Sequence, residues 1–122
     1  FPNIGPNAVN LTASQFNKLG FETGTVLMYA SNAVPTTQTI TGINDWLLCN
    51  GDAYSTSTYS ALYGIIGTTF GTSGSNFKVP DYRQYSPVGV GGTFVLGSAT
   101  TAQAATGTDV IKLQPINFLI KT

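Results

Sequence analysis

"DWLLCNGDAY", residues 45 to 54, is the stretch of sequence on which the fold prediction depends. It holds the only tryptophan of the chain, Trp46, and the only cysteine, Cys49, directly before an Asn50-Gly51 pair. Both central residues of a two-residue type I′ turn need positive φ, a conformation that Asn-Gly adopts readily. The stretch therefore predicts a β-hairpin with "WLLC" and "DAYS" as its strands, and with Trp46 and Cys49 as buried packing.

The segment after this hairpin predicts one short helix. In "STYSALYGIIG" the apolar residues recur at helical spacing, at Tyr59, Leu62, Tyr63 and Ile66. Ser57 or Thr58 is the expected N-cap, and Gly67 is expected to end the helix.

Two other segments have the pattern of strands. "GTVLMYAS", residues 24 to 31, is a β-branched and aromatic run that favours a strand buried on both faces. "INFLIK", residues 116 to 121, alternates and places Ile116, Phe118 and Ile120 on one face. "NAVPTTQTITGIN" and the glycine-rich "GTTFGTSGSNF" predict loops, and the latter lacks the Gly-Lys-Ser/Thr ending of a phosphate-binding loop. The expected fold is α+β and mostly β, in a small single domain with short strands, one short helix and long loops.

Composition favours an extracellular assembly. The 122 residues suffice for one core, and five basic and five acidic residues give a net charge of zero, which disfavours nucleic acid as a partner. Only 8% of residues are charged, while 18 Thr and 9 Ser supply neutral hydroxyls. A surface near zero net charge promotes association. No apolar run is long enough for a membrane span.

Residues 1 to 22 are expected to form an N-terminal arm that precedes a domain at residues 23 to 122. "AVNLT" alternates and is suited to adding a strand to a sheet edge on a neighbouring subunit. Asn10-Leu11-Thr12 is also the only N-glycosylation sequon, so Asn10 is the expected glycan attachment site. The chain begins at Phe1, which suggests a processed N-terminus or a partial sequence. The predicted assembly residues of the arm are Ala8, Val9, Asn10, Leu11, Thr12 and Phe16.

Catalytic and metal sites are not predicted. The chain has no histidine, and one cysteine cannot complete a zinc site. Cys49 lies in an apolar run, where burial makes a thiol inert. A pair of carboxylates flanking a glycosidic bond, or calcium held by Asn44, Asp45 and Asp52, are alternatives, but backbone capping explains these acidic residues more simply. No cofactor is expected.

The segment "VPDYRQY", residues 79 to 85, carries a separate hypothesis of binding. Asp81 and Arg83 are close enough for a charge-assisted hydrogen bond that holds an irregular loop. Tyr82 and Tyr85 are aromatic residues suited to stacking on sugars. These four residues are the predicted contacts of a cell-surface glycan.

Several spaced motifs, in order across residues 24 to 91, resemble the phage tail collar domain family. That family has a "G-x-I-x-x-[FY]" strand, a "GW-x-x-C-[DN]-G" segment, a "Y-x-x-L-[FY]-x-x-[IL]-G-[TS]-x-[FY]-G" helix and loop, and an "F-x-[LV]-PD-x-R" segment. The closing "LQPINFLIK" is similar to the last strand of the family. The matching stretches here are Gly24 to Tyr29, Trp46 to Gly51, Tyr59 to Gly71, and Phe77 to Arg83.

The sequence also departs from the family pattern. Ile43 to Asp45 separate Gly42 from Trp46 where the family has Gly-Trp, and Gln84-Tyr85 replaces a common Gly-Arg. The histidine-containing segment of many members is missing. The resemblance implies a structural or adhesive role without catalytic residues.

Two functions are expected from these observations. The first is a non-enzymatic structural subunit of an extracellular fibre, either a phage tail fibre or a phage-derived surface filament, which forms a filament or a trimer with copies of itself. The alternative is an adhesive module that binds a glycan or receptor at the tip of a tail fibre.

Overall fold

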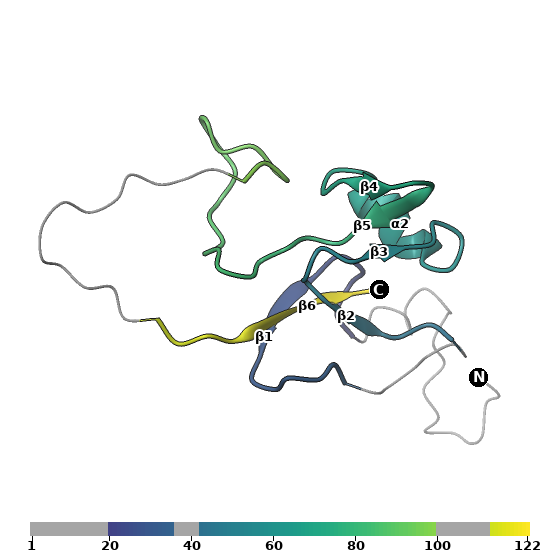
Figure 1. Cartoon of the computed structure of the whole chain (residues 1–122), viewed down its shortest axis with the longest axis horizontal. Helices are drawn as coiled ribbons and strands as arrows, with labels where there is room; N and C mark the ends of the chain where they lie inside the picture. Colours follow the sequence, from purple (N-terminus) through teal and green to yellow (C-terminus); the bar gives the residue numbers. More distant parts are fainter. Residues whose placement is uncertain (1–19, 36–41, 100–112) are drawn as a thin grey trace, which may run out of the picture.

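The computed structural model describes residues 20–35, 42–99 and 113–122. These residues form two small antiparallel sheets and one short helix (Figure 1). The strand orders are β1-β6-β2 in the first sheet and β3-β5-β4 in the second. This arrangement confirms the predicted α+β, mostly β class. The elements are β1 (Val26–Tyr29), β2 (Trp46–Leu48), β3 (Ala53–Tyr54), α2 (Ser60–Ile66), β4 (Thr72–Ser73), β5 (Asn76–Lys78) and β6 (Asn117–Lys121).

The first sheet is built around β6, the strand predicted in "INFLIK". Leu119 pairs with Leu27 of β1, and Ile120 pairs with Leu47 of β2. Because β6 is central, Leu119 and Ile120 are both buried although they point to opposite faces. The edge strand β1 is less covered than predicted, and 68% of Met28 is exposed.

The hairpin predicted at Asn50-Gly51 does not form, because its two strands belong to different sheets. Gly51 has a positive φ of 77°, but Asn50 is not among the residues with positive φ, so a type I′ turn is excluded. β2 pairs with β6 and β3 pairs with β5. The local turn signal is overridden because "WLL" finds its partner about 70 residues further along the chain.

Asn50-Gly51 instead joins the two sheets and lies antiparallel to residues 79–82. Asn50 forms an isolated β-bridge with Asp81. The Gly51 N–H donates to the Pro80 carbonyl at 3.2 Å, and the Tyr82 N–H donates to the Cys49 carbonyl at 3.1 Å. This pairing fixes where the segment after β5 leaves the core.

A hairpin does form in the glycine-rich segment that was predicted as a loop. β4 and β5 pair with Thr72 opposite Phe77 and Ser73 opposite Asn76. The connection is Gly74-Ser75, and Gly74 takes a positive φ of 60°. Two-residue hairpin turns need such a conformation, and glycine adopts it without steric penalty.

The predicted helix is present as α2, and Gly67 ends it as expected. Gly67 has φ 53°, and its N–H donates to the Tyr63 carbonyl at 2.8 Å. The predicted N-cap is wrong, because the cap position is Tyr59 and no side chain caps it. Ser55 organises the preceding turn: its hydroxyl oxygen accepts the N–H groups of Ser57 and Thr58 at 3.3 Å each.

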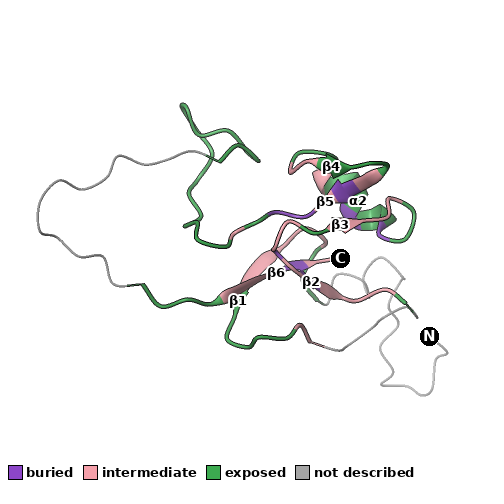
Figure 2. Cartoon of the chain, in the orientation of Figure 1, coloured by how far each residue is buried: buried purple, intermediate pink, exposed green. Residues whose placement is uncertain are grey.

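The core lies between the helix and the two sheets. Figure 2 shows buried residues on β2, β5, β6 and α2. The buried residues of the core are Leu47, Cys49, Tyr59, Leu62, Phe77, Val79 and Ile120. In the described parts of the chain, no helix is long and apolar enough to cross a membrane.

Trp46 was predicted to be buried beside Cys49, and this is wrong. Side chains alternate along a strand, so Leu47 and Cys49 enter the core while Trp46 points to the other face. Trp46 is half-buried and packs edge-on against Phe21, with ring centroids 5.7 Å apart.

Candidate functional site

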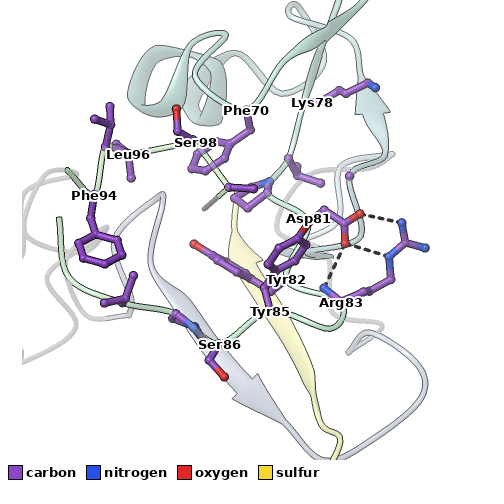
Figure 3. Close-up of a pocket in the computed structure, with 18 of the residues that line it drawn as sticks. Phe70, Lys78, Asp81, Tyr82, Arg83, Tyr85, Ser86, Phe94, Leu96 and Ser98 are labelled. Atoms are coloured by element: carbon purple, nitrogen blue, oxygen red, sulfur yellow. Dashed lines mark hydrogen bonds and ion pairs between the residues drawn. The ribbon is translucent and has the colours of Figure 1, made fainter. Parts of the chain in front are cut away.

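The segment after the core strand β5 begins with a tight turn held by Asp81 and Arg83. The Arg83 Nε donates to Asp81 Oδ1 at 2.9 Å, and Nη2 donates to Oδ2 at 2.8 Å (Figure 3). The Arg83 backbone N–H also donates to Asp81 Oδ1 at 3.1 Å. The charge-assisted bond predicted for this pair is confirmed, and it is bidentate.

The ion pair is exposed, with 67% of the Arg83 side chain and 40% of the Asp81 side chain accessible. The side-chain hydrogen bond from Arg83 lowers the pKa of Asp81, and the same bond raises the pKa of Arg83. The Asp81 carboxylate therefore stays ionised down to a lower pH than an ordinary aspartate does. Because solvent screens exposed charges, the main effect of the pair is to shape the turn.

The two tyrosines of this turn have different environments. Tyr82 is half-buried, its ring centroid lies 5.3 Å from that of Phe118, and burial raises the pKa of its hydroxyl. Tyr85 is 51% exposed. Its backbone N–H donates to the Tyr82 carbonyl at 3.1 Å, which closes the turn through Gln84.

A hollow of about 510 Å³, lined by both polar and apolar residues, lies beside this turn. Asp81, Tyr82, Arg83 and Tyr85, the four predicted glycan contacts, all line it, and Asn50 joins them. Figure 3 shows Tyr82 and Tyr85 on one side, with Phe94 and Leu96 on the other. The structure thus brings the four predicted residues together, and it adds apolar walls that sequence reasoning missed.

Those walls come largely from residues 85–97, here named the apolar flap. The flap has no charged residue. Figure 2 shows this part of the chain as exposed. The sequence pattern that could have indicated these apolar walls is "YSPVGVGGTFVLG", an uncharged run of apolar residues and glycines without strand or helix periodicity. Its large exposed apolar residues are Tyr85, Val88, Val90, Phe94, Val95 and Leu96.

Cys49 is a core residue, as predicted. It is 4% exposed, and burial together with the negative charge of Asp81 raises its pKa to about 12. At neutral pH the sulfur is therefore a neutral thiol without solvent access, which is unsuited to nucleophilic attack.

The Asp52 carboxylate serves the turn that leads to β3. Its Oδ2 accepts a hydrogen bond from Asn50 Nδ2 at 2.9 Å, and its N–H donates to Asn50 Oδ1 at 3.1 Å. Within residues 20–35, 42–99 and 113–122, no three acidic, histidine or cysteine side chains gather as they would around a metal ion.

The predicted assembly residues Ala8, Val9, Asn10, Leu11, Thr12 and Phe16 lie outside the described residues. The sequon at Asn10 lies there too. Of the predicted arm, the structure describes only residues 20–22.

A family model described as the Phage Tail Collar Domain matches residues 24–87, just over half of the chain. The chain belongs to the phage tail collar domain family. The tail collar match spans β1 to β5, helix α2 and the Asp81–Arg83 turn, and it confirms the resemblance in the sequence. None of the curated proteins compared with the chain gives a significant match.

A tail collar domain is a structural component of the phage tail and is not known as an enzyme. The family therefore suggests a structural component of a tail fibre, located in the virion and associated with other tail proteins.

Gln84 is the position where the tail collar pattern commonly has glycine. Its φ is 65°, and it is the only non-glycine residue with positive φ among those described. The left-handed conformation costs an L-residue about 1–2 kcal/mol. A glycine at position 84 would adopt this backbone conformation without that cost.

Proposed function

We propose that this tail collar chain is a non-catalytic structural subunit of an extracellular phage tail fibre, and that copies assemble by intersubunit strand addition. In this proposal residues 1 to 22 act as the donor arm of the domain at residues 23 to 122. The main support for this proposal is the outer edge of strand β1, which is unpaired within the described part of the chain.

β1 pairs with β6 on one side, and no other described strand pairs with it. Natural sheets protect such an edge with Lys, Pro or a covering segment, since unpaired N–H and C=O groups attract another strand. Residues 26–29, "VLMY", include neither charge nor proline, and 68% of Met28 is exposed. This edge is suited to accepting a strand.

The proposed donor is the alternating segment Ala8 to Thr12, with Phe16 as a further apolar contact. The ten residues that link Thr12 to the domain at residue 23 reach at most about 33–36 Å when fully extended, which is about the width of a small domain. The arm is therefore long enough to reach an edge on a neighbouring copy, and near-zero net charge leaves little repulsion between copies.

Deleting residues 1 to 16 is expected to yield a folded chain that no longer forms filaments or trimers, because the donor strand is lost. Electron microscopy and sedimentation equilibrium of the full chain and the truncated chain provide the measurement. A truncated chain that still forms filaments or trimers would contradict the arm as donor.

On the acceptor strand β1, Met28→Lys is expected to weaken assembly. Leu113→Lys is its control, because Leu113 is 79% exposed and lies outside β1.

A second candidate function is binding of a cell-surface glycan at a fibre tip. It is supported by the common location of Asp81, Tyr82, Arg83 and Tyr85 on one hollow. The exposed Tyr85 ring is available for stacking on a sugar, and the Arg83 and Asp81 side chains provide polar contacts.

For this candidate, Tyr85→Ala is expected to abolish specific binding on a glycan array, because the exposed aromatic face is lost. Tyr29→Ala is the matched control, since Tyr29 is 36% exposed and does not line the hollow. The absence of any specific signal from the well-folded chain would remove this candidate and leave the structural role.

A further inference from the structure

We infer that the apolar flap, residues 85–97, is a second assembly surface that binds another copy of this chain. This inference deepens the proposed self-assembly and rests on it. The flap is distinct from β1 and from the arm, so assembly through the flap can be tested separately.

The flap exposes far more apolar surface than isolated side chains would. Its exposed fractions are 51% for Tyr85, 65% for Val88, 65% for Val90, 38% for Phe94, 60% for Val95 and 58% for Leu96. At about half exposure each, these six side chains together present on the order of 600 Å² of surface, against the ~800 Å² per partner of a standard interface.

The shape of the flap is fixed by backbone contacts. The Gly91 N–H donates to the Phe94 carbonyl and the Phe94 N–H donates to the Gly91 carbonyl, both at 2.9 Å. At the far end, Gly97 has φ 80° and packs so closely on the Thr69 carbonyl that a Cβ would clash. At the near end, the bidentate Asp81–Arg83 pair holds the turn. Such an ordered surface binds with a smaller loss of conformational entropy.

The flap stands away from the core and leaves the hollow of about 510 Å³ between itself and Phe70, Val79 and Pro80. The flap side of the hollow is uncharged and carries exposed apolar side chains, so this side is suited to contact apolar side chains of a partner. A second copy offers such side chains on its own flap. Because the net charge is zero, two flaps meet without electrostatic repulsion.

The test compares full-length Val95→Lys with full-length Leu113→Lys by sedimentation equilibrium. Both changes place one charge at an exposed apolar position, but only Val95 lies on the flap. Val95→Lys is expected to weaken association about tenfold or more, because it places a charge in an apolar interface, while Leu113→Lys leaves it unchanged. Thermal unfolding checks that both variants are folded.

A second pair of variants tests the shape of the flap. Gly97→Ala is expected to weaken association because it displaces the flap from Thr69, whereas Gly89→Ala has no heavy atom within 4 Å of the added Cβ and is expected to associate normally. Equal association of Gly97→Ala and Gly89→Ala would overturn the role of flap shape.

The outcomes separate this inference from the proposed arm. Equal association of Val95→Lys and Leu113→Lys overturns the flap interface, whatever happens on deletion of residues 1 to 16. Weaker association of Val95→Lys, together with filaments or trimers that persist after that deletion, supports the flap and overturns the arm as donor. A full chain that stays monomeric at every concentration overturns both.

Discussion

Replacing Phe77 with alanine is expected to lower the free energy of unfolding by about 3–5 kcal/mol, as truncation of buried aromatic side chains does. Phe77 lies on the central strand of the second sheet and is fully buried. Its ring centroid is 5.4 Å from that of Tyr63 on α2, so the ring links the sheet to the helix. Chemical denaturation of the variant and the parent chain measures the loss.

Phe94→Ala is the matched control, because Phe94 is 38% exposed on the flap and its loss is expected to change stability by about 1 kcal/mol or less. If Phe77→Ala is too unstable to fold, Phe77→Leu keeps most of the side chain and is expected to lose a smaller part of the same energy. A loss for Phe77→Ala no larger than that for Phe94→Ala would refute its role in the core.

The Cys49 thiol is expected to react with a disulfide reagent roughly a thousandfold more slowly in the folded chain than in the unfolded chain at pH 8. The pKa of about 12 in the fold, against the ordinary 9.0, reduces the thiolate fraction by about three factors of ten, and burial further restricts access. Absorbance on addition of the reagent, with and without denaturant, gives the two rates. Comparable rates would contradict the buried placement.

The raised pKa of Cys49 also affects the stability of the fold at alkaline pH. The folded state holds the Cys49 proton to a higher pH than the unfolded state does. Stability is therefore expected to fall as pH rises from about 9 toward about 12. A Cys49→Ala variant lacks this group, so its stability should depend less on pH in that window.

The elements that depend on local pattern were predicted well from the sequence. Gly67 ends the helix because glycine accepts positive φ, and the alternation in "INFLIK" identifies β6. The Asp81–Arg83 bond was also predictable, since two residues of separation leave little freedom.

The pairing of strands could not be predicted in this way. Asn50-Gly51 has a strong hairpin signal, yet β2 pairs with β6, and no local feature encodes a partner so distant. The position of Trp46 was predictable in principle, because alternation places it opposite Leu47 and Cys49. The prediction failed by treating a large apolar side chain as core by type alone.

The candidate site was half predictable. Its polar turn at Asp81 and Arg83 follows from spacing, but the apolar walls of the hollow come from Phe70 and from flap residues that general rules would place inside a core. Exposure of Val88 and Val90 depends on how the backbone leaves the core after Tyr82, which the sequence does not reveal.

The central position of β6 also determines when the first sheet can form during synthesis of the chain. β1 and β2 lack their shared neighbour until residues 117–121 have left the ribosome. At roughly 5–20 residues per second, the roughly 70 residues that separate β2 from β6 take about 4–14 s to translate. Helix α2 and the β3-β5-β4 sheet lie within residues 53–78 and can fold in that interval. In the nascent chain, β1 and β2 therefore remain without their shared neighbour β6 for seconds.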